Sequence, residues 1–242
     1  MKKHLSVFTL IAHHSIYKVM LLLLVMAGAE IGIYLWRCGS SNPDTVDISW
    51  LIQFGRLHWV FFAALLLLTA ILTKSGQNLI GEKIYTMQRL SISEKAIFLW
   101  LTLYHSLCFL MVWALQAGLI FTLCSRYYAD LQASDSSLLL GQNILLMFYS
   151  LPFLHGLVPL ENTIGWYANL ACIVGLGFTT AWVPFQVRIR KFPGTATFML
   201  CCAILLFSRE NGAFLPNVGL ILASLLSVFI TLYSLYFSRK EG

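Results

Sequence analysis

Between Ile16 and Trp36 the chain reads IYKVMLLLLVMAGAEIGIYLW, a stretch in which Lys18 and Glu30 are the only charged residues. A helix needs roughly 20 mostly apolar residues to cross the hydrocarbon core of a bilayer. This stretch meets that requirement in both length and composition. It therefore predicts a membrane-spanning helix.

The composition of the whole chain also indicates a lipid environment. Of the 242 residues, 59% are hydrophobic and 11% are charged. A soluble domain carries roughly 25% charged residues, so this chain has too few to cover a water-facing surface. The polar stretch Arg37–Arg56 is too short to form a second core. We therefore expect one domain over residues 1–242, an all-α, polytopic membrane helix bundle.

The distribution of Lys and Arg decides how many apolar blocks cross the membrane, because these residues concentrate on the cytoplasmic side. After residues 16–36, the apolar blocks are 57–73, 96–124, 138–157, 166–185, 195–208 and 218–237. Seven crossings would divide the 16 Lys and Arg equally between the two sides. If 138–157 instead returns to the outer face, twelve lie inside, and four lie outside, namely Arg37, Arg56, Arg126 and Arg209. We therefore predict six spans in the cell membrane, with both termini cytoplasmic.

The block that is not expected to cross, 138–157, has helix-breaking residues in and just after its last turns. Pro152, Gly156 and Pro159 interrupt it, and irregular backbone at membrane depth needs shielding by protein or a water-filled cavity. We expect a re-entrant or broken outer segment, and an ordinary kinked crossing is the alternative.

Residues 1–15 predict a helix that lies in the cytoplasmic interface. Its basic residues, Lys2 and Lys3, would hold it at the lipid headgroups. The residues that share one helical face are Leu5, Phe8, Ile11 and Ala12.

Polar residues inside the apolar blocks are the candidates for a substrate pathway, because each is costly in lipid. They are Glu30, His105, Gln116, His155 and Glu161. Glu30 lies within Gly28-Ala29-Glu30-Ile31-Gly32, whose spaced small residues let another helix approach closely. Alternatively, Glu30 lies near the outer interface and reaches water or a donor on a neighbouring helix. The others would then be packing residues or helix caps.

Signatures of catalysis are missing from the sequence. There is no His-Glu-x-x-His zinc motif, no Gly-x-Ser-x-Gly elbow and no Cys-x-x-Cys pair. Gly76 and Gly81 have the spacing of a phosphate-binding loop, but Glu82 stands where that loop needs lysine. We therefore expect no catalytic residue, metal, cofactor or ATP hydrolysis in this chain. The net charge is +6. The basic residues that produce it lie beside the apolar blocks, at the ends of predicted helices, so nucleic acid is not an expected partner.

The loop between the second and third spans predicts a short amphipathic helix on the inner face of the membrane. Leu79, Lys83, Thr86 and Leu90 follow helical spacing, and Ser91 and Ser93 offer caps before the next span. We place this cytoplasmic helix at residues 76–92.

The same loop contains Thr86-Met87-Gln88-Arg89-Leu90 followed by Ser91-Ile92-Ser93. It resembles the permease subunits of type-2 ATP-binding-cassette exporters. In that family a cytoplasmic coupling helix runs into a Thr-apolar-x-x-Leu stretch and a Pro-apolar-Ser turn. Here Ser91 stands in place of the proline, and Tyr85 in place of a frequent glycine.

The resemblance implies a function that depends on partners. Two such subunits pair, as a homodimer or a heterodimer, and each docks its coupling helix into a cleft of a separate cytosolic ATP-binding subunit. The residues that would contact this ATPase are Glu82, Lys83, Thr86 and Arg89. The aromatic and aliphatic lining suggests an amphipathic or apolar substrate.

Other functions fit the same residues. A secondary transporter, or an ion or proton pathway, would use Glu30 and His105. An intramembrane enzyme would use His105, His155 or Glu161, although no paired catalytic constellation is present. A purely structural membrane subunit is a further alternative.

Overall fold

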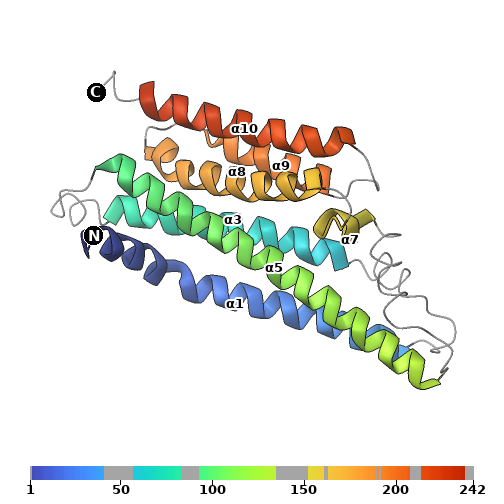
Figure 1. Cartoon of the computed structure of the whole chain (residues 1–242). Coiled ribbons are helices and arrows are strands. Elements are labelled where there is room, and N and C mark those ends of the chain that lie inside the picture. Colours follow the sequence, from blue (N-terminus) through green and yellow to red (C-terminus); the bar gives the residue numbers. More distant parts are fainter. Residues whose placement is uncertain are drawn as a thin grey trace.

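The computed structural model describes residues 2–40, 57–82, 93–134, 152–160, 163–188, 190, 192–207 and 214–237. Within these ranges the regular structure is entirely α-helical. The helices are α1 (Lys2–Ser40), α3 (Leu57–Glu82), α5 (Glu94–Ser134), α7 (Pro152–Leu157), α8 (Thr163–Arg188), α9 (Gly194–Phe207) and α10 (Phe214–Phe237). Figure 1 shows that all of them except the short α7 lie alongside one another as a bundle.

Five of these helices are long and apolar enough to cross a membrane. They are α1, α3, α5, α8 and α10, with candidate spans at 6–36, 57–81, 94–127, 163–188 and 215–236. The prediction of a multi-pass membrane helix bundle is confirmed. The predicted span 195–208 coincides with α9, which has 14 residues. At about 21 Å this helix is shorter than the hydrocarbon core of about 30 Å, so it is not a candidate span.

The ends of α5 and α8 show how the chain passes through the bundle. The rings of Trp113 on α5 and Trp166 near the start of α8 are 5.7 Å apart. At the other end, Glu94 at the start of α5 pairs with Arg188 at the end of α8. The two helices are therefore antiparallel, and α8 starts at the end of the bundle where α5 finishes (Figure 1).

The end of α5 and the start of α8 thus lie toward the same side of the bundle (Figure 1). Residues 135–151 lie outside the described residues, so their re-entrant path stays a prediction. The first turn of α1 and the last turn of α10 also share one end of the bundle (Figure 1).

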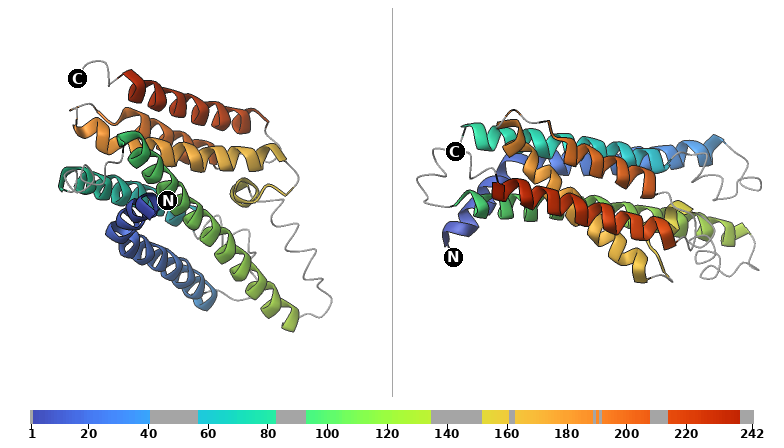
Figure 2. Two further views of the ribbon diagram at one scale, coloured as in Figure 1. Left: turned by 60° about the vertical axis from the view of Figure 1, so that its left-hand side comes forward. Right: turned by 90° about the horizontal axis from the view of Figure 1, so that it is seen from above.

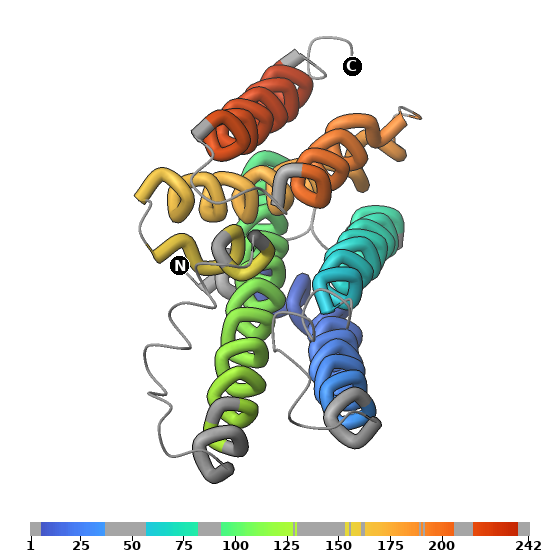
Figure 3. The backbone as a smooth tube through the Cα atoms, turned by 90° about the vertical axis from the view of Figure 1, so that its right-hand side faces the viewer, coloured from blue at the N-terminus to red at the C-terminus, as the bar shows by residue number. Residues whose placement is uncertain are grey.

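Helix α8 is the centre of the bundle and contacts α3, α5, α9 and α10. Seen from the α7 end, it passes between α5 and α10 (Figure 3). Close packing depends on glycine. Gly177 contacts Ser106 of α5, and Gly175 lies against Ser224 of α10. Small residues allow helices in membranes to approach this closely.

The N-terminal residues 2–15 are part of α1 and do not form a separate helix. Figure 2 shows that the first turns of α1 run at an angle to the rest of the helix. Val7 and Ile11 are buried, and Phe8 contacts the rings of Trp100 and Tyr104 on α5. The face of this segment that packs against α5 therefore includes residues predicted to face the membrane interface.

Helix α3 extends beyond its apolar block. The sequence predicts a span at 57–73 and a separate cytoplasmic helix at 76–92, but residues 74–82 continue α3. Leu79 and Ile80 are buried, and Gly76 lies against the ring of Pro184 on α8. Packing against the bundle thus continues the helix where its composition becomes polar. Residues 83–92 lie outside the described residues.

The outward faces of α1 and α10 are apolar, as a lipid environment requires. Large apolar side chains with more than half of their surface exposed include Leu24 and Leu35 on α1, and Leu222, Leu225 and Phe229 on α10. Gly28 and Gly32 also face outward, and none of the described residues comes within 4 Å of a Cβ placed on either. The close helix contact predicted for this pattern is not made within the described chain.

Candidate functional site

Glu30 of α1 and Gln116 of α5 form a fully buried polar pair, and both are among the residues predicted to line a substrate pathway. Both side chains have an exposed fraction of 0%, and they lie close enough to interact. Neither carboxylate oxygen nor either polar atom of the carboxamide makes a hydrogen bond with good geometry among the described residues. Glu30 therefore lies buried inside the bundle, next to a polar side chain of a neighbouring helix.

His105 makes a different contact, about three turns before Gln116 on α5. Its Nδ1 lies 3.0 Å from Oγ1 of Thr180 on α8. The Thr180 hydroxyl donates its single proton to the carbonyl oxygen of Leu176, at 2.6 Å. With its proton on that carbonyl, Thr180 accepts from the Nδ1–H tautomer of His105, whose side chain has an exposed fraction of 1%. This arrangement is a packing contact between helices, and it does not bring His105 to Glu30.

Two further polar contacts were missed by the sequence analysis. The Ser15 hydroxyl donates to the phenolic oxygen of Tyr104 at 2.8 Å, joining α1 to α5 inside the bundle. Asn169 on α8 donates from Nδ2 to the carbonyl oxygens of Gly156 and Leu157, at 2.9 and 3.3 Å. The signal for Asn169 was present, because a buried amide within an apolar block must find a partner.

The Asn169 amide fixes the position of α7. The last carbonyl groups of a helix have no partner within it, and α7 has only six residues. Asn169 supplies donors for two of these carbonyls. Phe153 of α7 adds ring contacts with Phe61 and Phe62 of α3, at 6.0 and 6.4 Å between centroids. The end of the predicted broken segment is therefore held against α8 and α3.

Of the other two predicted pathway residues, the structure places only one backbone. His155 lies within α7, but its side chain lies outside the described part of the structure. Glu161 lies outside the described residues altogether. Among the residues described, no group of three or more His, Cys, Asp or Glu side chains could hold a metal ion.

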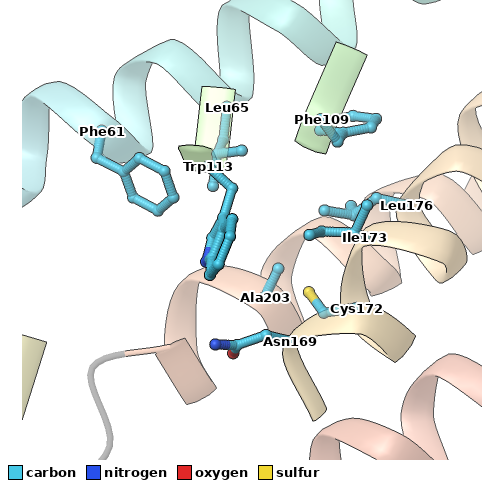
Figure 4. Close-up of a pocket in the computed structure, with 9 residues that line it drawn as sticks. All are labelled: Phe61, Leu65, Phe109, Trp113, Asn169, Cys172, Ile173, Leu176 and Ala203. Atoms are coloured by element: carbon cyan, nitrogen blue, oxygen red, sulfur yellow. The ribbon is translucent and has the colours of Figure 1, made fainter. Parts of the chain in front are cut away.

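A pocket lies beside Asn169, between α3, α5, α8 and α9 (Figure 4). The space inside it is small, about 20 Å³. The lining residues are Phe61, Leu65, Phe109, Trp113, Asn169, Cys172, Ile173, Leu176 and Ala203. The lining is aromatic and aliphatic except for Asn169, the Cys172 thiol and the indole N–H of Trp113.

The opposite end of the bundle contains the predicted docking region. Glu82 is the last residue of α3, and its side chain is not described. The other predicted docking residues, Lys83, Thr86 and Arg89, lie outside the described residues. Two contacts flank this connection. The Arg188 guanidinium lies 3.1 Å from the Glu94 carboxylate, and Gly76 lies against Pro184.

Contacts between aromatic rings also join α5 to α8 in this region. The Phe98 ring of α5 lies 5.8 Å from the Trp182 ring and 6.1 Å from the Phe185 ring, both on α8. The helices before and after the predicted docking loop are thus both packed against the last turns of α8.

Comparison of the chain with protein-family models, with curated proteins and with solved structures finds no match.

Proposed function

We propose that this multi-pass membrane protein is the permease subunit of a type-2 ATP-binding-cassette exporter. It moves an amphipathic or apolar substrate across the cytoplasmic membrane, with both termini in the cytosol. It pairs with a second permease subunit, and a separate ATPase supplies the energy. Residues 83–92, between α3 and α5, dock into that ATPase together with Glu82.

The observation that carries this proposal is the mechanical connection of the docking loop to the centre of the bundle. The loop joins the end of α3 to the start of α5, and both contact the last turns of α8 through Gly76–Pro184 and Glu94–Arg188. A force applied to the loop would therefore act on three helices together. An ATPase that changes shape as it binds and releases nucleotide could therefore move these three helices through the loop.

Helix lengths support the remaining parts of the topology. The 39 residues of α1 extend over about 58 Å, well beyond a hydrocarbon core of about 30 Å. The bent first turns, before Lys18, then lie at the cytoplasmic interface. On the outer side, residues 138–157 dip into the bundle and return. On this topology α9 provides the sixth crossing although its 14 residues do not by themselves reach across the hydrocarbon core, so the bilayer thins locally around it.

Charge reversal in the docking loop tests the proposal. From detergent-solubilised native membranes, the wild-type chain should co-purify with an ATP-binding-cassette ATPase, identified by mass spectrometry and by ATP hydrolysis in the eluate. Arg89→Glu should lower both signals about ten-fold or more, because like charges facing each other across an interface cost several kcal/mol. Lys240→Glu reverses a charge outside the loop, on the side of the membrane that this proposal makes cytosolic, and should leave both unchanged. Equal recovery with Arg89→Glu would contradict the proposal.

A secondary transporter, or an ion or proton pathway, is the second candidate. The observation that favours it is the complete burial of the Glu30 carboxylate beside Gln116, where it makes no hydrogen bond of good geometry to a described residue. On this alternative, the chain alone in vesicles passes ions or protons down an imposed gradient without nucleotide. Glu30→Gln then abolishes the flux, and Glu94→Gln, a change at an exposed ion pair, does not. The permease proposal expects no such flux from the chain alone.

A further inference from the structure

The turn between α8 and α9 holds an arginine in a backbone conformation that favours glycine. Arg190 has a φ of 55°, in the left-handed region that residues with a side chain rarely adopt. Its N–H donates to the carbonyl oxygen of Val187 at 3.0 Å and closes the end of α8. Glycine is the usual residue at such a position, and any other residue is held there at a cost in free energy. An arginine at this position therefore indicates a role for its side chain.

The Arg190 side chain belongs to a group of exposed charges at the end of the bundle where α3 ends and α5 begins (Figure 1). Arg188 pairs with Glu94 at 3.1 Å, and both remain more than half exposed. Lys95 directly follows Glu94, and Arg190 lies two residues after Arg188, so each is close to this pair in the chain. Glu94 offsets only one of the three basic residues, and the group therefore keeps a positive charge.

An exposed aromatic ring accompanies these charges. Phe192, two residues after Arg190, has an exposed fraction of 79%. Its carbonyl oxygen accepts a hydrogen bond from the N–H of Gly194 at 2.8 Å, directly before α9 continues the chain. Hydrogen bonds thus order the backbone on both sides of the turn while the ring stays outside the bundle. Apolar rings next to basic residues are typical of segments that lie in the headgroup region of a membrane.

The position of the turn fits such a surface. The candidate span of α8 extends to Arg188, and only five residues separate α8 from α9. So short a connection between two apolar helices stays near the point where the chain leaves the hydrocarbon core. A lipid surface is a plane, so basic residues on both α5 and α8 can reach it together.

We propose that Lys95, Arg190 and Phe192 form a binding site for an anionic phospholipid. The two basic side chains contact the phosphate of the headgroup, and the Phe192 ring lies at the boundary with the acyl chains. Arg188 stays paired with Glu94. Anionic lipids are concentrated in the cytoplasmic leaflet, the side to which the proposed topology assigns this turn. The site itself rests on the membrane-spanning fold and requires no ATPase, so it can stand if the proposed function fails.

Lipid competition on the purified full-length chain tests this site. The chain in detergent is mixed with equal amounts of phosphatidylglycerol and phosphatidylcholine with the same acyl chains, and native mass spectrometry measures the ratio of the bound lipids. We expect the wild type to retain phosphatidylglycerol in preference. Lys95→Gln should lower this preference about five-fold, the value for one basic residue near a charged lipid surface.

Arg190→Gly tests the arginine without disturbing the fold. Glycine adopts a φ of 55° easily, so the midpoint of thermal denaturation should stay equal or rise, while the lipid preference falls about five-fold. Arg190→Lys keeps the charge and should retain most of the preference. Phe192→Ala should weaken the binding of both lipids equally, because both have the same acyl chains.

Arg126→Gln is the control for net charge. It removes one positive charge from an exposed residue near the other end of α5 and should leave the lipid ratio unchanged. An equal loss with Arg126→Gln would show that only net charge matters, and an unchanged ratio with Arg190→Gly would show that this arginine does not bind the headgroup. Either result would overturn the proposal. If Arg190→Gly leaves the ratio unchanged but prevents co-purification of an ATPase, the turn contacts protein and the lipid site is wrong.

Discussion

Replacing Gly177 by valine is expected to disrupt the bundle. A Cβ at position 177 would lie 3.0 Å from both the backbone nitrogen and the Cβ of Ser106, and closer still to its Oγ. A side-chain rotation moves Oγ away, but the backbone nitrogen of α5 cannot yield unless the helices separate. Overpacking of a close contact costs about 3 kcal/mol at the upper end of its usual range. We expect a markedly lower midpoint of thermal denaturation in detergent and a loss of monodisperse protein in size-exclusion chromatography.

The control for this prediction is valine at another glycine in a long helix. Gly118 of α5 has nothing within 4 Å of a Cβ, so Gly118→Val should leave the denaturation midpoint nearly unchanged. Ser106→Gly added to Gly177→Val removes the Oγ and Cβ contacts but not the backbone contact, so it should restore stability only in part. A Gly177→Val protein as stable as the Gly118→Val protein would show that α5 and α8 do not pack this closely.

Replacing Asn169 is expected to release α7 from the bundle. Asn169→Leu removes both donors and leaves the buried carbonyl groups of Gly156 and Leu157 without these partners. An unsatisfied buried polar group costs about 1–3 kcal/mol. Asn169→Asp should be more harmful, because a carboxylate would face two carbonyl oxygens. Hydrogen exchange measured by mass spectrometry should show faster exchange of amides in residues 153–158 for both variants.

Thr122→Val is the matched control for Asn169. Its hydroxyl donates to the carbonyl oxygen of Leu119 within its own helix, so its loss affects no contact between helices. Exchange in α7 should then equal that of the wild type. If Asn169→Leu also leaves exchange in α7 unchanged, the ring contacts of Phe153 alone hold this segment, and the amide is dispensable.

Helix α8 contacts both the helices that flank the docking loop and the pocket beside Asn169. At one end it contacts the helices that flank the docking loop, through Pro184 and Arg188. Toward the other end it contributes four of the residues that line the pocket, including Asn169. On the proposed function, a movement imposed at the loop would therefore reach the pocket along a single helix. This makes α8 the element in which substitutions should affect both regions.

The sequence could identify individual candidate residues of the site, but not which of them lie next to one another. Glu30, His105 and Gln116 attract attention in the sequence because each is a polar group in an apolar block. Hydropathy cannot tell which of them meet. The structure pairs Glu30 with Gln116, and His105 with Thr180, a residue 75 positions away.

By itself, the sequence determined that this protein is a helical, multi-pass membrane protein and which apolar blocks form its long helices. These properties are local: about 20 apolar residues in a row favour a membrane span whatever else the chain does. Tertiary structure decided how far helices such as α1 and α3 extend beyond their apolar blocks, and which polar groups face each other. Both depend on how closely helix faces approach. Single contacts, such as Gly177 with Ser106 and Gly76 with Pro184, set that approach, and hydropathy along the chain does not record them.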